Sequence, residues 1–592
     1  MKLGMLSKKW SQFSSREYPR ESGIVAYFSM EIAITPEVPT YSGGLGVLAG
    51  DTIRAAADMG LRLVALTLAY RKGYFKQHLD ANGVQTEEAQ PWDLKSKLAP
   101  EEPVVTVFIE GRPVAIRAWR YDMEGVTGHT IPIYLLDTDL EQNDPRDREL
   151  TDHLYGGDGD YRLRQETVLG IGGARVLEAL EYQPLVYHMN EGHAALLTIA
   201  LLERKLRGKS LKEATDKDLE AVRQQCVFTT HTPVPAGHDR FSLEQGYRIL
   251  GSERTELIER VAGSSDGPLN MTYIALRFAR YANGVAMKHG KVSREMFPNY
   301  TIDAITNGVH AATWTAPAFQ SVFDRHLPRW REDNLKLRYA MDIPESEIAE
   351  AHLEGKRALI AAVKNRTGLE LRPEIFTMGF ARRAATYKRC DLLFADTCRL
   401  LRCARELGGL QILYSGKAHP ADDPAKEKIR QVIELAKQLS SDELKIVYLE
   451  NYDWSLGALL TGGVDLWLNT PKRPYEASGT SGMKAALNGV PSLSVLDGWW
   501  IEGWNEGVTG WAISDHDEEI DEANSLYEHL EQVILPLFYR RPNEWRRIMR
   551  STIAFNGSYF NMQRMLEQYV LNAYFPERRV VSAPALELVP AH

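Results

Sequence analysis

The 592-residue sequence has little cysteine and no long apolar run. Its four cysteines form no Cys-x-x-Cys pair, which argues against a structural zinc site or a redox dithiol. Sparse thiols fit a reducing compartment. No stretch reaches the ~20 apolar residues that span a bilayer, and Met1 to Arg20 lacks the apolar run of a signal peptide. The sequence therefore predicts a cytoplasmic protein without a membrane segment.

The charge and composition exclude further classes. A net charge of -9 over this length is mild, so it argues against a nucleic-acid-binding surface and does not select a substrate. With 44% apolar and 25% charged residues and no solenoid repeat, the chain is typical of globular proteins. It is too long for one ordinary core, which predicts at least two large domains.

Short apolar runs alternate with helical patterns along the chain. Such runs between helices indicate parallel strands covered on both faces. A charged, helix-rich stretch, about residues 318–372, separates two series of runs, so we expect an α/β protein with two doubly wound, Rossmann-like domains facing across a cleft. The expected divisions are 1–317, 318–555 and 556–592, the last being a closing amphipathic helix after a stop at Asn556-Gly557 and a mobile tail from Pro576.

A glycine loop, Tyr41 to Gly46, precedes a helical pattern from Leu48 to Met59. Glycines let backbone amides approach an anion, and a helix N-terminus adds partial positive charge. A packing or turn requirement explains most such loops equally well. The loop alone is therefore only compatible with an anion site.

A basic turn follows the apolar run that ends at Phe380. It places Arg382, Arg383, Lys388 and Arg389 within eight residues. Arginine offers phosphate a planar fork and lysine a point charge, so the turn suits a phosphate site at a strand exit. The alternative is a solvated basic turn.

A third segment runs from Tyr475 to Lys484, and a short helix there is expected to end at Asn488-Gly489. Lys484 lies in an apolar setting, where desolvation would deprotonate its amine, as a Schiff base requires. Most helical lysines face solvent, which is the alternative. These patterns indicate a cleft enzyme that binds an anion, but they do not name a reaction.

The segment Glu476-Ala-Ser-Gly-Thr-Ser-Gly-Met-Lys484 resembles the cofactor-lysine motif of the glycogen and maltodextrin phosphorylases, retaining glycosyltransferases of the two-domain GT-B type. The resemblance implies an α-1,4-glucan phosphorylase that uses inorganic phosphate to release α-D-glucose 1-phosphate from glycogen, starch or maltodextrin, with pyridoxal 5′-phosphate as cofactor. Other segments resemble the family in the same order between about residues 24 and 500: 42–46, 73–77, 162–166, 189–193, 229–233, 306–308, 382–389, 416–418 and 450–452.

The resemblance assigns roles residue by residue. Lys484 corresponds to the lysine that binds the cofactor, and Arg383 and Lys388 to cations that hold substrate phosphate beside the cofactor's own phosphate. That cofactor phosphate is implied to support proton transfer through the substrate phosphate, with the α configuration retained. The remaining matches are Gly43, Gly44, Tyr452, Thr480 and Ser481 on the cofactor and phosphate side, Glu476, Ser478, Gly479 and Asn307 at the glucose, and Asn190, Glu191 and His231 along the sugar subsites.

Three positions depart from the animal enzymes: Asp453 and Val47 replace arginines, and Ala385 replaces a histidine. With the shorter chain, these make the sequence most similar to the compact bacterial and archaeal forms, for which we expect no N-terminal regulation.

Two rival functions follow: a nucleotide-sugar-dependent glucan synthase, which would lack the cofactor lysine, and an inactive glucan-binding relative. The family favours dimers, but no interface signature is visible, and chain-length preference and physiological direction are open.

Two clusters have competing interpretations. His188, Glu191 and His193 do not share one helix face, so we expect no metal site there. Trp499 and Trp500 suit sugar stacking and core packing equally.

Overall fold

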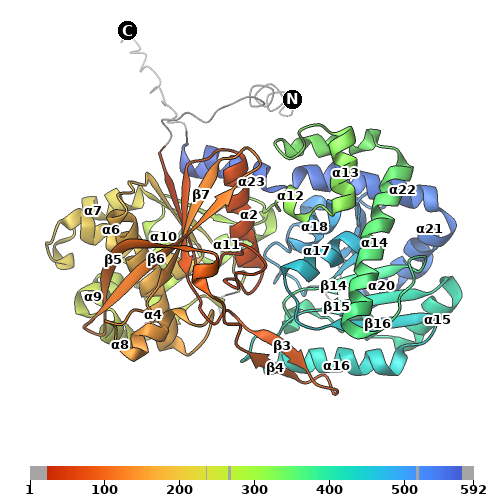
Figure 1. Cartoon of the computed structure of the whole chain (residues 1–592), viewed down its shortest axis with the longest axis horizontal. Coiled ribbons are helices and arrows are strands. Elements are labelled where there is room, and N and C mark those ends of the chain that lie inside the picture. The colour runs from red at the N-terminus through yellow and green to blue at the C-terminus, as the bar shows by residue number, and fades with distance from the viewer. Residues whose placement is uncertain (1–22, 235–236, 264–268, 515–518, 577–592) are drawn as a thin grey trace, which may run out of the picture.

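The computed structural model describes residues 23–576 except 235–236, 264–268 and 515–518, so the predicted mobile tail after Pro576 lies outside the described residues. Two large sheets surrounded by helices make the chain a mixed α/β protein with parallel strands. Figure 1 shows them side by side, in a first lobe built mainly from residues before 310 together with α23, and a second lobe built mainly from the residues between.

The first sheet is parallel except at the edge formed by its two longest strands, β5 and β6. Exposed residues interrupt β5, so no continuous apolar run marks it in the sequence. Strand β1 is the switch point of the sheet: β2 lies on one side of it and β8, which begins the next run of parallel strands, lies on the other. Ligands of open α/β sheets bind at such a switch point. In spatial order the strands are β13 (Asp303–Ala304), β12 (Tyr281–Gly284), β9 (Cys226–Thr229), β8 (Val186–Asn190), β1 (Val25–Ser29), β2 (Leu63–Leu68), β7 (Thr130–Asp137), β6 (Arg112–Glu124) and β5 (Ala99–Ile109).

The second sheet is wholly parallel, and its strand order reverses between β14 and β17. The basic turn follows β14 and the Glu476 loop follows β17, so both leave the sheet at that reversal. The strands in spatial order are β16 (Leu444–Leu449), β15 (Leu410–Ser415), β14 (Thr377–Ala381), β17 (Leu466–Asn469), β18 (Ser492–Val495) and β19 (Gly510–Ile513).

An antiparallel hairpin of β3 (Lys76–Leu79) and β4 (Gln85–Glu88) extends from the first lobe onto the second, beside α16 (Figure 1). The side-chain Nε2 atoms of Gln77 and Gln85 donate to backbone carbonyls of the second lobe, each at 2.9 Å. The hairpin therefore ties the two lobes together beside the loops that follow β15 and β16. A smaller hairpin pairs β10 (Arg240–Phe241) with β11 (Leu269–Asn270).

Helices pack around both sheets (Figure 1). Several begin at a side-chain cap: Thr215, Ser242 and Asn270 each accept a backbone N–H in the first turn of their helix. In chain order the α-helices are α2 (Gly44–Asp58), α3 (Pro145–Arg148), α4 (Gly159–Thr167), α5 (Gly173–Ala179), α6 (Leu197–Leu206), α7 (Asp216–Arg223), α8 (Leu243–Ile249), α9 (Ser252–Ala262), α10 (Met271–Phe278), α11 (Met287–Met296), α12 (Ala311–Trp314), α13 (Pro317–His326), α14 (Glu345–Thr367), α15 (Thr397–Leu407), α16 (Asp423–Leu439), α17 (Trp454–Gly463), α18 (Ser481–Ala486), α19 (Trp500–Gly503), α20 (Glu519–Glu528), α21 (Leu535–Arg540), α22 (Pro542–Thr552) and α23 (Met562–Tyr569).

The end of the chain returns to the first lobe. The predicted stop at Asn556-Gly557 is wrong: both residues are buried inside a helical turn, Ile553–Gly557, that continues α22. The predicted closing amphipathic helix is confirmed as α23, whose apolar side chains join a core shared with α2, β1 and β2. Its start is fixed because the Met562 N–H donates to the carbonyl of Val309 at 2.9 Å.

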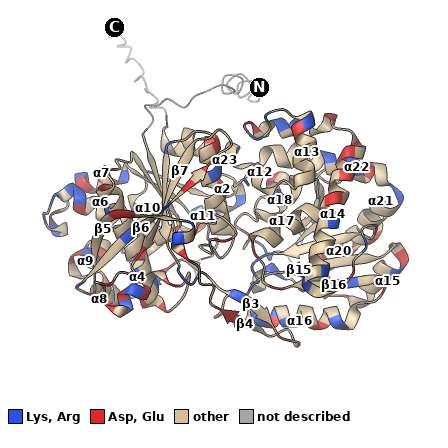
Figure 2. Cartoon of the chain, in the orientation of Figure 1, with Lys and Arg blue, Asp and Glu red and all other residues tan. Residues whose placement is uncertain are grey.

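Among the described residues, no helix combines the length and apolarity that a membrane crossing needs. Figure 2 shows Lys and Arg interspersed with Asp and Glu along the outer helices of both lobes.

Candidate functional site

A buried ion cluster lies where the strand order of the second sheet reverses. Glu476 accepts hydrogen bonds from Arg382 Nη2 at 2.8 Å and from Lys388 Nζ at 2.5 Å, and each of these side chains is less than a tenth exposed. Burial acts to raise the pKa of Glu476, but the two cations outweigh it and lower that pKa to about 2. The carboxylate is therefore ionised at neutral pH and balances only one of the two positive charges.

Arg382 also has unused donors. Its Nε and Nη1 atoms are buried and have no hydrogen-bond partner among the described residues, and the same holds for the hydroxyl of Ser478. Unsatisfied buried donors are costly, and a guanidinium presents its N–H groups in the geometry that phosphate and carboxylate oxygens accept. Excess positive charge and free N–H groups together make this cluster suited to an anion.

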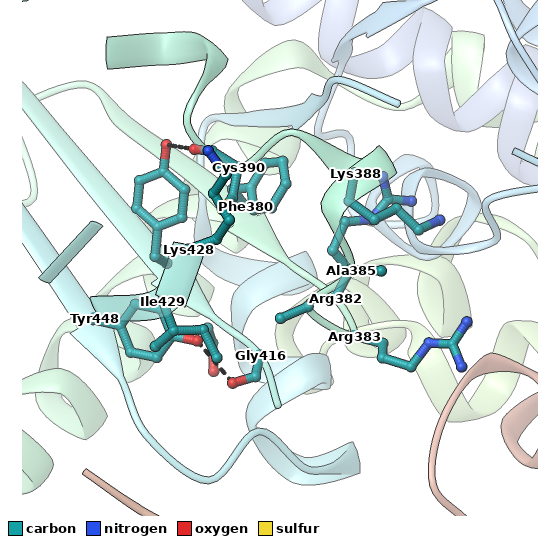
Figure 3. A pocket seen from close by; sticks show the side chains of 13 residues that line it. Phe380, Arg382, Arg383, Ala385, Lys388, Cys390, Gly416, Lys428, Ile429 and Tyr448 are labelled. Carbon is teal, nitrogen blue, oxygen red and sulfur yellow. Dashed lines mark hydrogen bonds between the residues drawn. The ribbon is translucent and has the colours of Figure 1, made fainter. Parts of the chain in front are cut away.

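A cavity of about 20 Å³ lies behind the basic turn, lined in part by Phe380, Tyr414 and Tyr448. It has room for about one water molecule, so it is too small for phosphate. Figure 3 shows Arg382 and Lys388 directed to one side of the turn and Arg383 to another. This cavity is therefore not the place where Arg382 and Lys388 would hold a phosphate.

Arg383 takes no part in the Glu476 cluster. It is exposed, and its charge acts first on Tyr387 in the same turn and then on Tyr74 and Glu31, both in the first lobe. The resemblance assigns Arg383 and Lys388 to substrate phosphate, but only Lys388 contacts Glu476. Arg383 therefore provides a positive charge separate from the Glu476 cluster.

Glu31, just after β1, holds the glycine loop. Its buried carboxylate accepts the N–H groups of Ser42 at 2.5 Å and Gly43 at 3.1 Å, and the Tyr155 hydroxyl at 3.0 Å. A carboxylate at the start of α2 is also favoured by the helix dipole. A Cβ added at Gly43 or Gly44 would meet no atom within 4 Å. The loop therefore faces open space, although the Gly43 amide is already bonded within the protein.

Lys484 is buried in α18 and does not face solvent. Its Nζ lies 3.6 Å from the centroid of the Trp314 ring. Burial lowers the pKa of Lys484 to about 8, against the opposing charge of Asp51. At pH 7 about a tenth of the amine is then uncharged, compared with about one in 3000 at the ordinary value of 10.5. At neutral pH a larger fraction of this amine is thus in the uncharged, nucleophilic form than for a solvent-facing lysine.

Other cofactor-side matches surround this helix and Arg382. Thr480 is the N-cap of α18, and Ser481 begins it with a hydroxyl that accepts from Trp467 Nε1 at 3.1 Å. Burial raises the pKa of Tyr452 to about 12, with Asp453 adding to the shift and Arg382 opposing it. The Tyr452 hydroxyl therefore keeps its proton and can donate it in a hydrogen bond.

The sugar-side matches form a second group at the first sheet. His231 donates from Nε2 to Asn190 Oδ1 at 2.7 Å, and its backbone N–H donates to Glu191 Oε2 at 2.7 Å. Burial lowers the pKa of His231 to about 4, against the charge of Glu191, so the ring is neutral. With Nε2 as the donor, Nδ1 is an acceptor that suits a hydroxyl group.

Asn307 and Gly479 complete the matches. Asn307 is buried with an unpartnered Oδ1, while its carbonyl accepts from Arg564 Nη2 at 2.8 Å. Gly479 has a φ of +81°, and a Cβ there would lie 3.3 Å from the Glu476 side chain. Glycine is therefore required for the loop to fold over Glu476.

The three departures from the animal enzymes have local roles. Asp453 caps α17, because its carboxylate accepts the Leu456 N–H at 2.8 Å. Val47 joins the hydrophobic core, and Ala385 lines the small cavity. None of the three introduces a charge directly into the Glu476 cluster.

The two competing interpretations are resolved by burial. Trp499 and Trp500 are 2% and 1% exposed and pack against each other in the core, so they are not sugar platforms. His188 is a core residue bonded to Tyr574 at 2.7 Å and Thr229 at 2.9 Å. In the part of the chain that the structure describes, no group of three His, Cys, Asp or Glu residues suits a metal.

Glu31 and Asp497 have no role assigned from the sequence, and Arg382 has one only as a member of the basic turn. Asp497 accepts the N–H groups of Glu476 and Gly498, each at 2.9 Å, and so fixes the Glu476 loop. Arg382 stands in the run of cations and Glu31 directly after an apolar run, which are signals that could have marked them. No sequence signal marks Asp497.

Comparison with known proteins gives a consistent result. A sequence model of the family described as carbohydrate phosphorylase matches residues 243–511. A maltodextrin phosphorylase of Thermococcus litoralis is 39% identical, over 95% of this chain and 72% of its own. Glycogen phosphorylases of Mycobacterium tuberculosis and Aquifex aeolicus are 38% and 34% identical over 93% of this chain, and over 71% and 86% of their own lengths.

Proposed function

Because the chain belongs to the carbohydrate phosphorylase family, we propose that it is an α-1,4-glucan phosphorylase. It releases α-D-glucose 1-phosphate from glycogen, starch or maltodextrin with inorganic phosphate. The observation that carries the proposal is the buried cluster of Arg382, Lys388 and Glu476, with its excess positive charge and unused N–H groups.

The protein's part in the reaction is mainly electrostatic. Arg382 and Lys388 bind phosphate from the second lobe, and Arg383 adds a positive group facing the first. A phosphate proton passes to the glycosidic oxygen as its bond to C1 breaks, and a phosphate oxygen then bonds to C1 from the same face. The α configuration is therefore retained. Glu476 accepts sugar hydroxyls, so no glycosidase-type carboxylate pair is required.

The sugar is bound from both lobes. Asn190, Glu191 and His231 line the subsites from the first sheet, and the neutral His231 ring accepts a hydroxyl through Nδ1. The unpartnered Ser478 hydroxyl and Asn307 Oδ1 offer further hydrogen bonds, and Gly479 leaves the sugar room at the Glu476 loop.

The residues around Lys484 fit pyridoxal 5′-phosphate. A buried amine with a pKa of about 8 suits covalent attachment of its aldehyde, and the unused N–H groups of Arg382 suit its phosphate. Backbone amides at Thr480 and Ser481, the Tyr452 hydroxyl, and the loop at Gly43 and Gly44 line the same region. When bound, the cofactor supplies a phosphate group beside the substrate phosphate.

We also propose the GT-B arrangement of two domains, 1–317 and 318–555. Residues Met562 to Tyr574 pack with the first lobe, which supports grouping the closing helix with the first domain. The cytoplasmic location and the homodimer that the family favours stay predictions.

The test is phosphate-dependent release of glucose 1-phosphate from maltooligosaccharides of graded length. A glucan synthase would instead need a nucleotide sugar, and an inactive relative would bind maltodextrin without release. Lys484→Ala should lose covalently attached cofactor, whereas Arg383→Ala should keep it and lose phosphate affinity. Unchanged phosphate kinetics in Arg383→Ala would remove that residue from the site.

A further inference from the structure

Trp314, at the end of α12, lies between the lysine of α18 and the helix that begins at the glycine loop. The Lys484 Nζ atom lies over one face of its ring, 3.6 Å from the centroid. The indole N–H donates to Asp51 Oδ2, on α2, at 2.7 Å. Trp314 is 2% exposed and Asp51 is 1% exposed. Three helices from distant parts of the sequence therefore meet through one ring.

Asp51 is itself held firmly. Its Oδ2 also accepts the backbone N–H of His310 at 3.1 Å, and its Oδ1 lies 3.6 Å from Arg54 Nη1. Arg54 in turn donates to the carbonyls of Ala33 and Ile34. The carboxylate that receives the Trp314 N–H is thus fixed to the segment that leads into the glycine loop.

The other side of the lysine is fixed through Asn488. Its Nδ2 donates to the carbonyls of Trp314 at 2.9 Å and Lys484 at 3.1 Å, and its Oδ1 accepts the Ala316 N–H at 2.7 Å. Asn488 therefore sets the backbones of Trp314 and Lys484 at a constant separation. The lysine side chain itself is not fixed this way, because no acceptor lies within hydrogen-bond distance of Nζ among the described residues.

We propose that Trp314 and Asp51 are positioning residues for the cofactor lysine: the ring is the surface on which the Lys484 side chain lies, and Asp51 fixes the plane of that ring. The proposal rests on the proposed attachment of pyridoxal phosphate to Lys484. A lysine stem has many rotamers, and ordering it in advance removes an entropic cost from the attachment step. The ring and the carboxylate also favour the charged amine, which offsets part of the effect of burial.

A matched residue separates this role from ordinary core packing. Trp330 belongs to the same hydrophobic core, is 1% exposed, and donates its indole N–H to Asp324 at 2.8 Å. Its ring carries the guanidinium of Arg331, at 4.6 Å from the centroid, and no lysine amine of the described residues. Trp330→Phe therefore removes the same atoms as Trp314→Phe, including an N–H bonded to a carboxylate, without altering the surroundings of Lys484.

The experiment measures covalent attachment of pyridoxal phosphate to cofactor-depleted full-length protein. At intervals, samples are reduced with borohydride and the mass increase at Lys484 is quantified. Trp330→Phe should match the wild type, whereas Trp314→Phe should attach the cofactor about tenfold more slowly, because the loosened amine spends less time in the reactive geometry. Equal attachment rates in the two variants would overturn the proposal.

Asp51→Asn is the second variant, and it decides the matter if Trp314→Phe does not fold. It keeps the ring but removes the one charge that opposes burial at Lys484. At a pH above the midpoint, where the amine is uncharged in both proteins, attachment should be slower than in the wild type, and the midpoint of its rate against pH should move to lower pH. A rate and midpoint equal to those of the wild type would contradict the role of Asp51. Wild-type protein that attaches the cofactor at another lysine, or at none, would instead refute the proposed function.

Discussion

Replacing Glu476 by glutamine should leave two buried positive charges that only an added anion can balance. Glutamine has nearly the same shape, but it leaves the charges of Arg382 and Lys388 buried without a counter-charge. Phosphate brings negative charge to the same two cations. The variant should therefore be less stable than the wild type without phosphate and gain more stability from it.

The magnitude follows from the pKa of Glu476, which is about 2 compared with an ordinary value of 4.5. A difference of about 2.5 corresponds to about 3 kcal/mol in favour of the ionised form, similar to the cost of breaking a buried ion pair. Because the folded pKa lies below the unfolded one, this stabilisation is present above pH 4.5 and lost as pH falls toward 2. Glu476→Gln should thus cost about 3 kcal/mol at pH 7, and the cost should shrink in acid.

The assay is thermal unfolding in phosphate-free buffer and then along a phosphate titration. Glu522→Gln is the control, since Glu522 is a buried carboxylate paired with Arg389 and Arg473 in the same lobe. Both variants should unfold at lower temperature, but phosphate should raise the unfolding temperature more for Glu476→Gln than for the control or the wild type. An equal phosphate response in the two variants would refute the assignment of the cluster as the anion site.

Three further predictions concern the fold around the site. Lys356→Met breaks a fully buried ion pair with Asp465, whose atoms lie 2.6 Å apart. It should lower the free energy of unfolding by about 3–5 kcal/mol and leave the KM for phosphate unchanged. A changed KM would contradict a purely structural role for the pair. Gln85→Leu removes the bond from the Ala418 N–H at 3.1 Å, so hydrogen exchange at that amide should accelerate, and unaltered exchange would contradict the bridging role of the hairpin. Iodoacetamide should modify Cys398 first, because this thiol is exposed, whereas burial raises the pKa of the other three thiols to about 12. Mass spectrometry that shows another cysteine modified first would contradict this.

The second sheet could be predicted closely because its strands are buried on both faces. In the sequence, the apolar runs from Phe376 to Phe380 and from Gln411 to Ser415 lie within one residue of β14 and β15. The first sheet was harder, since β5 pairs at an edge and alternates exposed with buried residues. At Asn556-Gly557, a pair that usually ends a helix is buried by the lobes around it, so tertiary packing overrides the local signal.

The chemistry of the site was predictable as residue types but not as pairings. The run of cations and the lysine motif mark the anion and attachment sites in the sequence. Glu476 pairs with Lys388 and Arg382 because two loops more than 80 residues apart in the sequence meet in the folded chain, and no local pattern predicts that pairing. The contact of Lys484 with Trp314 joins positions even further apart and has no sequence signature.

The return of α23 to the first lobe affects how the chain can mature during synthesis. Tyr569 and Tyr574 complete hydrogen bonds to His188, Thr229 and Asn283, and the side chains around them close one wall of the core. A ribosome adds about 5–20 residues per second, so this wall emerges on the order of tens of seconds after β12. Until then the nascent first lobe has an apolar strip without its cover. Translation that stops early would leave it exposed to aggregation or to a chaperone.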